Sequence, residues 1–194
     1  MNTLPAEYLR DSLNTIHSVP EVLMDEFLAL WEICEAERKE VVTQAGRREH
    51  YLYYVLEGCQ KAYFLNDGKE HIVAFSCPHA FTCIPESFLT GNVSLYDWQC
   101  IEHSRFLRIS RTAFFAFIEE HPAFERMLWK QLLGTVNGLV RRYHRLLAFS
   151  MEERFRDLMH NSPSLINRVP QKDLASYLRI DPTNFSKLIN SLKI

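Results

Sequence analysis

A run of short polar side chains followed by a lysine lies near the end of the sequence. On a helix, apolar residues would form a buried stripe made of Phe185, Leu188, Ile189 and Leu192. The opposite face would carry Thr183, Asn184, Ser186, Lys187 and Asn190. Short donors in the first turn reach base edges in the major groove, and a lysine one turn later reaches guanine or the backbone. The free N–H groups and dipole at the helix start favour phosphate. This pattern predicts a helix that reads duplex DNA.

A shorter helix precedes the reading helix at the spacing of a helix-turn-helix. Residues 171–178 would bury Leu174, Ala175 and Leu178, and Ile180 would fill the corner between the two helices. Asp181 is a good N-cap, and the proline after it suits the first helical position. The sequence therefore predicts a helix-turn-helix from Val169 to Ile194.

Further contacts with DNA are expected from the first helix and the turn. Gln171 and Lys172 begin the first helix, where they could hold phosphate. Arg179 lies in the turn and adds a cation. If this position requires a positive φ, an arginine there adds strain of about 1 kcal/mol.

Charge is unevenly distributed along the 194 residues, whose net charge is −2. From Arg141 to Ile194 there are ten Lys/Arg and five Asp/Glu, against twelve and nineteen in the rest. A basic segment on an acidic body favours a polyanionic partner. The alternative is a chance fluctuation of surface charge.

Other chemistries are less well supported by the sequence. A cupin-like metal site could draw on the neighbouring residues His71, Cys77, His79, Cys83 and Glu86. That site requires two histidines one residue apart on a strand, and this spacing is missing, so no metal is expected. Nucleophile–base motifs, a Gly-rich phosphate loop and HExxH are also missing. We therefore expect a protein that is not an enzyme, with a cupin-like metalloenzyme as a remote alternative.

The cysteines and the apolar runs indicate the compartment. Five cysteines form no CxxC pair and are odd in number, which favours free thiols in a reducing cytosol. No apolar run approaches the roughly 18 residues of a membrane span, and residues 1–10 do not resemble a signal peptide. A cytoplasmic location and no membrane partner are expected.

Three zones precede the reading helix. Helical spacing of Leu23, Phe27, Leu30, Trp31 and Cys34 predicts an N-terminal helical zone up to Arg38. Residues 39–110 are rich in β-branched and aromatic residues and suggest short antiparallel strands, with a hairpin turn at 66–68. Residues 112–119 and 123–149 are predicted to form helices. The strands predict a barrel or jelly roll.

The long helix has an apolar stripe close to heptad spacing. Its members are Leu128, Leu132, Thr135, Leu139, Tyr143 and Leu146. Gly134 and Gly138 weaken the helix by about 1 kcal/mol each but permit close backbone approach. We expect a homodimer seam along this stripe, the alternative partner being the chain's own barrel.

This combination resembles the Crp/Fnr family of bacterial transcription regulators. Residues 51–58 look like the family's strand ending in a turn glycine, and residues 67–71 look like the hairpin that follows. Residues 174–187 are close to the family's recognition signature. The resemblance implies an α+β chain, with a sensor β-roll similar to cyclic-nucleotide-binding domains, a dimerisation helix and a helix-turn-helix. The boundaries expected for these three parts are 1–121, 122–149 and 150–194.

The family's phosphate cassette is altered in this sequence. In that family a Gly-Glu pair holds the ribose hydroxyl and an Arg-Ser pair holds the cyclic phosphate. Here Cys83-Ile84 and Ser94-Leu95 stand at those places, and no arginine lies between Phe81 and Glu102. Glu86 would repel a phosphate. We expect no cofactor and no cyclic AMP binding of the family's usual kind; an effector pocket, if present, would involve Phe81, Cys83, Ile84, Glu86, Ser94 and Leu95.

The resemblance implies a DNA-binding transcription regulator. Its expected partners are double-stranded DNA, a second copy of the chain, an unknown small effector and RNA polymerase. Because the sequence ends at Ile194, the β-hairpin wing of longer members is expected to be missing. The alternative is a ligand-sensing or protein-interaction module with a vestigial helix-turn-helix.

Overall fold

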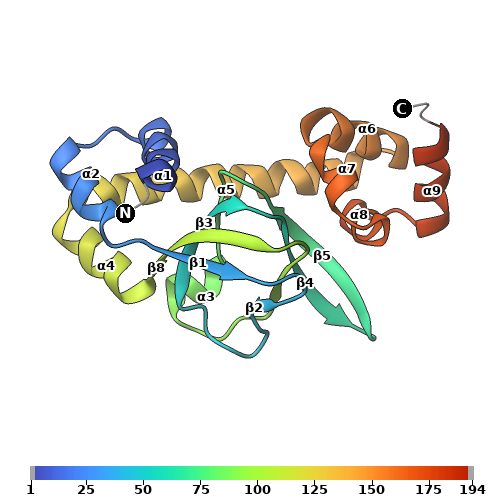
Figure 1. The fold of residues 1–194 in the computed structure, drawn as a ribbon. Helices are drawn as coiled ribbons and strands as arrows, with labels where there is room; N and C mark the ends of the chain where they lie inside the picture. The colour runs from blue at the N-terminus through green and yellow to red at the C-terminus, as the bar shows by residue number, and fades with distance from the viewer. Residues whose placement is uncertain (1–2, 192–194) are drawn as a thin grey trace.

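The computed structural model describes residues 3–191, so residues 192–194 of the expected recognition helix, and with them the expectation about the wing, lie outside the described part. The helices are α1 (Thr3–Ile16), α2 (Glu21–Leu28), α3 (Pro85–Thr90), α4 (Arg111–Glu120), α5 (Pro122–Ala148), α6 (Met151–Asn161), α7 (Ser164–Arg168), α8 (Gln171–Leu178) and α9 (Pro182–Ser191). The strands are β1 (Glu32–Ala36), β2 (Val41–Thr43), β3 (Tyr51–Glu57), β4 (Gln60–Asn66), β5 (Lys69–Ser76), β6 (Phe81–Thr82), β7 (Asp97–Cys100) and β8 (Ser104–Ser110). Figure 1 shows the β-roll in the middle, α1, α2 and α4 near one end of the long α5, and α6–α9 at its other end. Within the described residues, no helix combines the length and apolar character needed to cross a bilayer.

The β-roll consists of two antiparallel sheets, ordered β1-β8-β3-β6 and β2-β7-β4-β5. The continuous apolar run of β3 is explained by burial of both its faces. Tyr53 and Val55 face the core between the sheets, together with Trp98 and Phe106, while Tyr54 belongs to the core under the helices. Alternate side chains of a strand point to opposite faces, so this strand contributes to two cores. The predicted α+β class, with an antiparallel roll followed by helices, is confirmed.

The N-terminal helical stripe ends earlier than the sequence predicted. Helix α2 ends at Leu28, and the Trp31 N–H closes a turn by donating to the Leu28 carbonyl at 3.2 Å. Cys34 lies in β1, opposite Phe106 of β8. Trp31 is nevertheless part of the core, where it packs edge-to-face on Phe27 with ring centroids 5.9 Å apart. The helical spacing was therefore accidental, and pairing with β8 decided the structure of the last residues.

The hairpin turn predicted at residues 66–68 is confirmed. Asp67 and Gly68 have φ angles of 50° and 70°, the two left-handed residues of a type I′ turn. The turn sets the register of β4 and β5, in which Asn66 lies opposite Lys69. Sequence analysis missed β1, β2, β6, α3 and α7, because elements of two to six residues are too short to show a clear period.

The predicted helix-turn-helix is formed by α8 and α9. The apolar residues expected inside it are buried in the described structure: Leu174, Ala175, Leu178, Ile180 and Phe185. Leu188 and Ile189 are half-buried beside them. The same core includes Phe155 of α6 and Leu165 of α7, so α6–α9 share one apolar centre.

Candidate nucleic-acid interface

The proposed reading face of α9 is open to solvent. Thr183, Ser186, Lys187 and Asn190 are exposed, and Asn184 is half-exposed. Beneath them Phe185 is 1% exposed and packs edge-to-face on Phe155, with ring centroids 5.4 Å apart. A buried aromatic anchor therefore fixes the orientation of a helix whose polar side points outward.

The start of α9 differs from the expectation that its N–H groups are free for phosphate. One carboxylate oxygen of Asp181 accepts hydrogen bonds from the N–H of Thr183 at 2.8 Å and of Asn184 at 3.4 Å. Asp181 thus acts as the predicted N-cap. Its negative charge also opposes a phosphate at the same place.

The turn between α8 and α9 is held by an arginine that sequence analysis did not identify. Arg154 of α6 donates hydrogen bonds to the carbonyls of Phe149 at 2.6 Å, Leu178 at 2.9 Å and Arg179 at 3.4 Å. Leu178 and Arg179 lie 24 and 25 residues from Arg154 in sequence, which explains why no local pattern indicated the contact. The carbonyls at the end of a helix lack partners within the helix, and Arg154 supplies hydrogen-bond donors for those at the end of α8. These bonds hold the turn in place.

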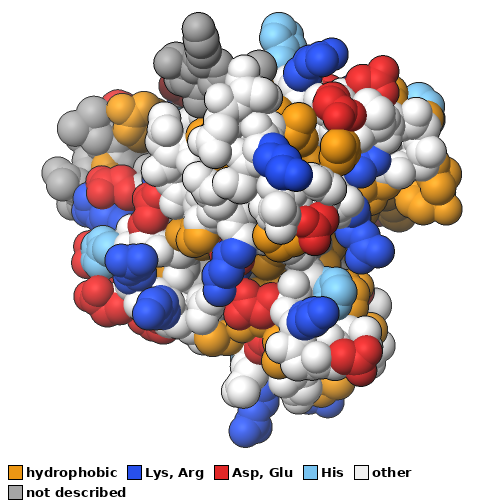
Figure 2. All heavy atoms as spheres, turned by 90° about the vertical axis from the view of Figure 1, so that its right-hand side faces the viewer, with side chains coloured by type: hydrophobic (Ala, Val, Ile, Leu, Met, Phe, Trp, Pro, Cys, Tyr) orange, Lys and Arg blue, Asp and Glu red, His pale blue; other side chains and the backbone are white. Residues whose placement is uncertain are grey.

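Exposed cations surround the reading face. Arg179 adopts the left-handed conformation, with φ 56° and ψ 44°, as its place in the turn suggested. Arg179, Lys172 and Lys187 are exposed, and Gln171 is exposed at the start of α8. Figure 2 faces this end of the molecule and shows Lys and Arg side chains interleaved with Asp and Glu. Among the residues that the structure describes, this face carries separate cations and no single continuous basic patch.

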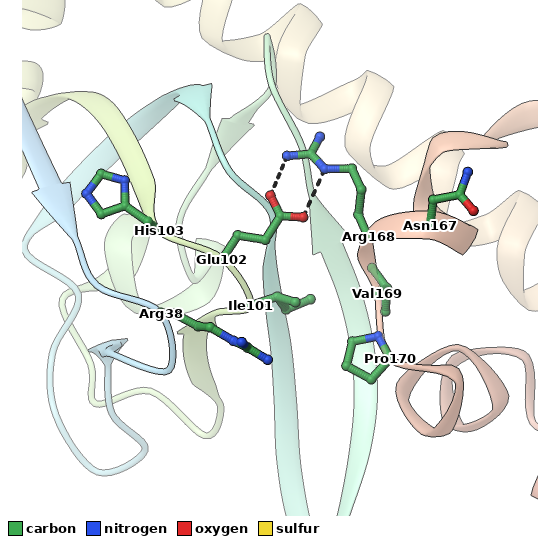
Figure 3. Close-up of a pocket in the computed structure, with 8 residues that line it drawn as sticks. All are labelled: Arg38, Ile101, Glu102, His103, Asn167, Arg168, Val169 and Pro170. Carbon is green, nitrogen blue, oxygen red and sulfur yellow. Dashed lines mark hydrogen bonds and ion pairs between the residues drawn. The ribbon is translucent and has the colours of Figure 1, made fainter.

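The helix-turn-helix is attached to the β-roll by two ion-pair groups. Lys61 of β4 lies 3.2 Å from Asp173 of α8 and also pairs with Glu70 of β5. Arg168 of α7 forks onto Glu102 of the roll, with bonds of 3.0 and 2.7 Å. Figure 3 shows Arg168 and Glu102 bonded to each other, and both line a pocket of about 420 Å³ between the roll and the segment leading into α8.

Polar contacts along β5 extend this junction. Ser176 of α8 accepts a hydrogen bond from the N–H of Ile72 and donates one to the Glu70 carbonyl, both at 3.1 Å. Arg142 of α5 lies over the Tyr177 ring at 4.3 Å and donates to the Tyr177 and Ile72 carbonyls. Helix α8 is therefore fixed to the roll on one side, and α9 is left on the outside.

The exposed apolar stripe of α5 follows a register different from that of the predicted seam. Leu128, Leu132 and Leu146 are half-buried against the rest of the chain, whereas Leu139 and Tyr143 are exposed, as is Thr135. Six exposed apolar side chains of α5 recur at spacings of three and four residues. They are Trp129, Leu133, Val136, Val140, Tyr143 and Leu147. An added Cβ at Gly134 or Gly138 would meet nothing within 4 Å. The face at these glycines is open.

The six residues expected to line an effector pocket are not brought together. Phe81 and Cys83 pack against the core under the helices, and Ile84 fills the core between the sheets. Glu86 is exposed and Leu95 is 70% exposed. Ser94 is buried, but its hydroxyl donates to the Tyr96 carbonyl at 2.7 Å. The residues on either side of α3 are thus divided between different packing layers and do not line one pocket.

A buried carboxylate lies beside the start of α3 instead. Glu49 is 2% exposed and accepts hydrogen bonds from Thr43 Oγ1 at 2.6 Å and from the N–H groups of Tyr51 at 3.2 Å and Ile84 at 3.3 Å. Burial raises the pKa of the Glu49 carboxyl, although these hydrogen bonds act in the opposite direction.

The residues weighed for a metal site are engaged separately. His71 stacks on Phe64 with ring centroids 5.0 Å apart, and His79 packs against Tyr8 at 5.0 Å. Cys77 contacts Cys59. Among residues 3–191, no group of three or more His, Cys, Asp or Glu side chains is placed to hold a metal ion.

The fold is an antiparallel β-roll followed by a long helix and a C-terminal helical unit that contains a helix-turn-helix. Residues 33–121 match the family model of the cyclic nucleotide-binding domain. No curated protein sequence matches the chain significantly.

Solved structures of regulators share the fold over most of the chain. CLP of Xanthomonas campestris, a c-di-GMP responsive global regulator, aligns with a TM-score of 0.69 at 16% identity, over 90% of this chain and 92% of that one. FixK2 from Bradyrhizobium japonicum gives 0.69 at 17% identity, over 84% of each chain. The sensor domain of the transcriptional regulator DNR from Pseudomonas aeruginosa gives 0.57 at 20% identity, over 76% and 97%. The chain has the fold of Crp/Fnr-type regulators, as the resemblance predicted.

Proposed function

We propose that this protein is a DNA-binding transcription regulator of Crp/Fnr type that reads duplex DNA with α9. The observation that carries the proposal is that α8 is bound to the β-roll whereas the polar side of α9 is open to solvent. Asp173 and Ser176 of α8 are engaged with the β-roll, while the polar side of α9 is exposed. The reading helix can therefore enter a major groove without release of the unit from the roll.

The expected contacts fall into two groups. Thr183, Asn184 and Ser186 would contact base edges, and Lys187 with Asn190 would contact guanine or the backbone. Gln171, Lys172 and Arg179 would hold phosphates on either side of the groove. RNA polymerase is the further partner that this function involves. The parts of the regulator would be the roll at 1–121, the long helix at 122–149 and the DNA-binding unit at 150–194.

A homodimer is part of the proposal, with the seam moved to the exposed stripe of α5. Trp129, Leu133, Val136, Val140, Tyr143 and Leu147 have the spacing of a two-stranded coiled coil. Two reading helices on one dimer would contact successive major grooves, about 34 Å apart. The half-buried Leu128, Leu132 and Leu146 then support the helix from within its own chain.

We further propose that the roll does not take cyclic AMP in the family's usual way. The support is the buried Glu49 carboxylate beside the N–H of Ile84, together with an inter-sheet core filled by Tyr53, Trp98 and Phe106. A thermal unfolding scan with cyclic AMP should show no shift, since a ligand that does not bind the folded state does not stabilise it. A rise of several degrees would contradict this part alone.

The DNA-binding proposal is tested by selection from random duplexes followed by affinity measurements. A recovered consensus is expected to bind the wild type, with Lys187→Ala weakening binding about tenfold, or ~1.4 kcal/mol. Arg47→Ala is the matched control, because Arg47 is an exposed cation on the roll, away from α9. Failure to recover any consensus would favour the alternative of a protein-interaction module, and equal binding by Lys187→Ala would reject the reading face.

A further inference from the structure

Two cysteines close the open end of the β4–β5 hairpin. The register of this hairpin ends with Gln60 opposite Ser76, and Cys59 and Cys77 continue it by one residue. Directly opposed residues of antiparallel strands have Cα atoms about 4.5–5.5 Å apart. That separation lies inside the range of about 4.4–6.8 Å that a disulfide spans.

The two sulfur atoms are already in contact. Cys59 Sγ and Cys77 Sγ are 2.9 Å apart, and both cysteines are in the thiol form. Cys59 is fully buried, whereas Cys77 is half-exposed. A small oxidant can therefore reach Cys77, and the buried Cys59 is the only thiol of the described residues placed against it.

The surroundings of the pair link it to the helix-turn-helix. Cys59 and Cys77 pack in the same apolar cluster as the core of α6–α9, which includes Leu174 and Ile180. The Cys59 carbonyl accepts the N–H of Ile101 at 2.8 Å. The thiols thus lie under the surface where the DNA-binding unit is attached.

We propose that Cys59 and Cys77 form a reversible redox modification site that is oxidised to a disulfide by hydroperoxides. The Cys77 thiolate attacks one oxygen of the peroxide, the O–O bond breaks, and Cys77 sulfenic acid forms with release of water or an alcohol. Cys59 sulfur then attacks the Cys77 sulfur, and the sulfenic oxygen leaves as water after taking up a proton. Two thiols lose two electrons, the peroxide gains them, and the S–S separation shortens to about 2.05 Å.

The electrostatics agree with these roles. Contact with Cys59 and the nearby Arg168 guanidinium lower the pKa of the Cys77 thiol, with burial acting against them. Contact with Cys77 and burial raise the pKa of the Cys59 thiol. By contrast, burial raises the pKa of the Cys34 thiol to about 11. Thiolates are the reactive species, so Cys77 is the thiol that meets the oxidant and Cys59 the one that resolves it.

Peptide mapping of the full-length protein tests the proposal directly. The reduced protein is treated with hydrogen peroxide, remaining thiols are alkylated under denaturing conditions, and a non-reduced digest is analysed by mass spectrometry. Trypsin cleaves at Lys61 and Lys69 and so separates the two cysteines, and chymotrypsin cleaves at Phe81 and separates Cys77 from Cys83 and Cys100. We expect two of the five thiols to be lost, one Cys59–Cys77 peptide pair to appear, and dithiothreitol to restore both thiols.

Variants assign the roles of the two sulfurs. Cys59→Ser should leave Cys77 as a sulfenic acid that dimedone traps, and Cys77→Ser should retain the Cys59 thiol. Cys34→Ser is the control and should form the same disulfide as the wild type. Retention of all five thiols, or a disulfide that joins other cysteines, would overturn the proposal. The wild-type map decides even if a variant fails to fold, and no outcome depends on whether the protein binds DNA.

Discussion

The Lys61 ammonium lies 3.2 Å from the Asp173 carboxylate, although 112 residues separate them in sequence. Both side chains are 6% exposed. Lys61 lies in β4 and Asp173 in the first turn of α8, so this ion pair joins the β-roll to the helix-turn-helix. A buried charge without its partner is costly, which makes the pair sensitive to loss of either residue.

Lys61→Met is therefore expected to lower the free energy of unfolding by about 3–5 kcal/mol, because Asp173 would stay buried without a cation. The measurement is urea denaturation at a fixed protein concentration. The double variant Lys61→Met/Asp173→Leu is the control and should recover most of the loss, since it leaves no buried charge. A single variant as stable as the wild type would show that the pair does not hold the junction.

Glu49→Gln should change how stability depends on pH. Burial raises the pKa of the Glu49 carboxyl above its ordinary 4.5, so the folded state binds this proton more tightly than the unfolded chain. The contribution of Glu49 to the free energy of unfolding is therefore greatest at low pH. It falls as the pH rises above about 4.5 and stops falling once the pH has passed the raised pKa of the folded state.

The glutamine variant lacks that titration, and its single oxygen can still accept the Thr43 and Ile84 hydrogen bonds, which share one oxygen of Glu49. The Tyr51 bond to the other oxygen is lost, which lowers stability equally at every pH. Unfolding free energies measured from pH 4 upward, on a scale set by ~1.4 kcal/mol per pKa unit, should show the variant gaining on the wild type as the pH rises. Parallel curves would mean that Glu49 is charged at no cost in the folded state.

Arg179→Gly should stabilise the fold and weaken DNA binding at the same time. The arginine has a φ of 56°, a conformation that costs a non-glycine residue about 1–2 kcal/mol. The glycine variant should melt roughly 2–4 °C higher for each kcal/mol of strain removed. It should also reduce by about one the slope of log affinity against log salt, because one phosphate contact is lost. Arg179→Ala is the control, since it removes the cation and keeps the strain.

The dimer seam can be tested at the exposed stripe of α5. Val140 is 60% exposed, and Val140→Glu would place like charges against each other at the centre of the seam. Sedimentation equilibrium should then show a monomer where the wild type is a dimer. Arg141→Glu is the matched control on the adjacent face of the helix. If the dimer persists in Val140→Glu but dissociates in Leu132→Glu, the result would favour the seam register predicted from the sequence over the exposed stripe.

Features determined by neighbouring residues could be predicted from the sequence. The Asp67-Gly68 hairpin turn, the Asp181 cap and the buried face of α8 follow from conformational preferences within a few positions. A left-handed Arg179 was considered only as a condition, and the structure meets that condition with a φ of 56°.

Features that depend on distant contacts could not be predicted in this way. Arg154 under the turn, Glu49 beside Ile84 and the Cys59–Cys77 contact bring together residues that no sequence period connects. The register of the dimer seam stays a prediction. Leu132 and Leu133 are equally apolar, but Leu132 is half-buried within the chain and Leu133 is 61% exposed.

The attachment of α8 to the roll limits how freely the two units can be exchanged between regulators. The junction relies on matched partners, Lys61 with Asp173 and Arg168 with Glu102, which lie in segments far apart along the chain. A helix-turn-helix transplanted from another regulator would bring its own side chains to a surface shaped for these charges. A functional chimaera would need its joint designed as a set of complementary pairs, and a cut at the end of α5 would not be enough.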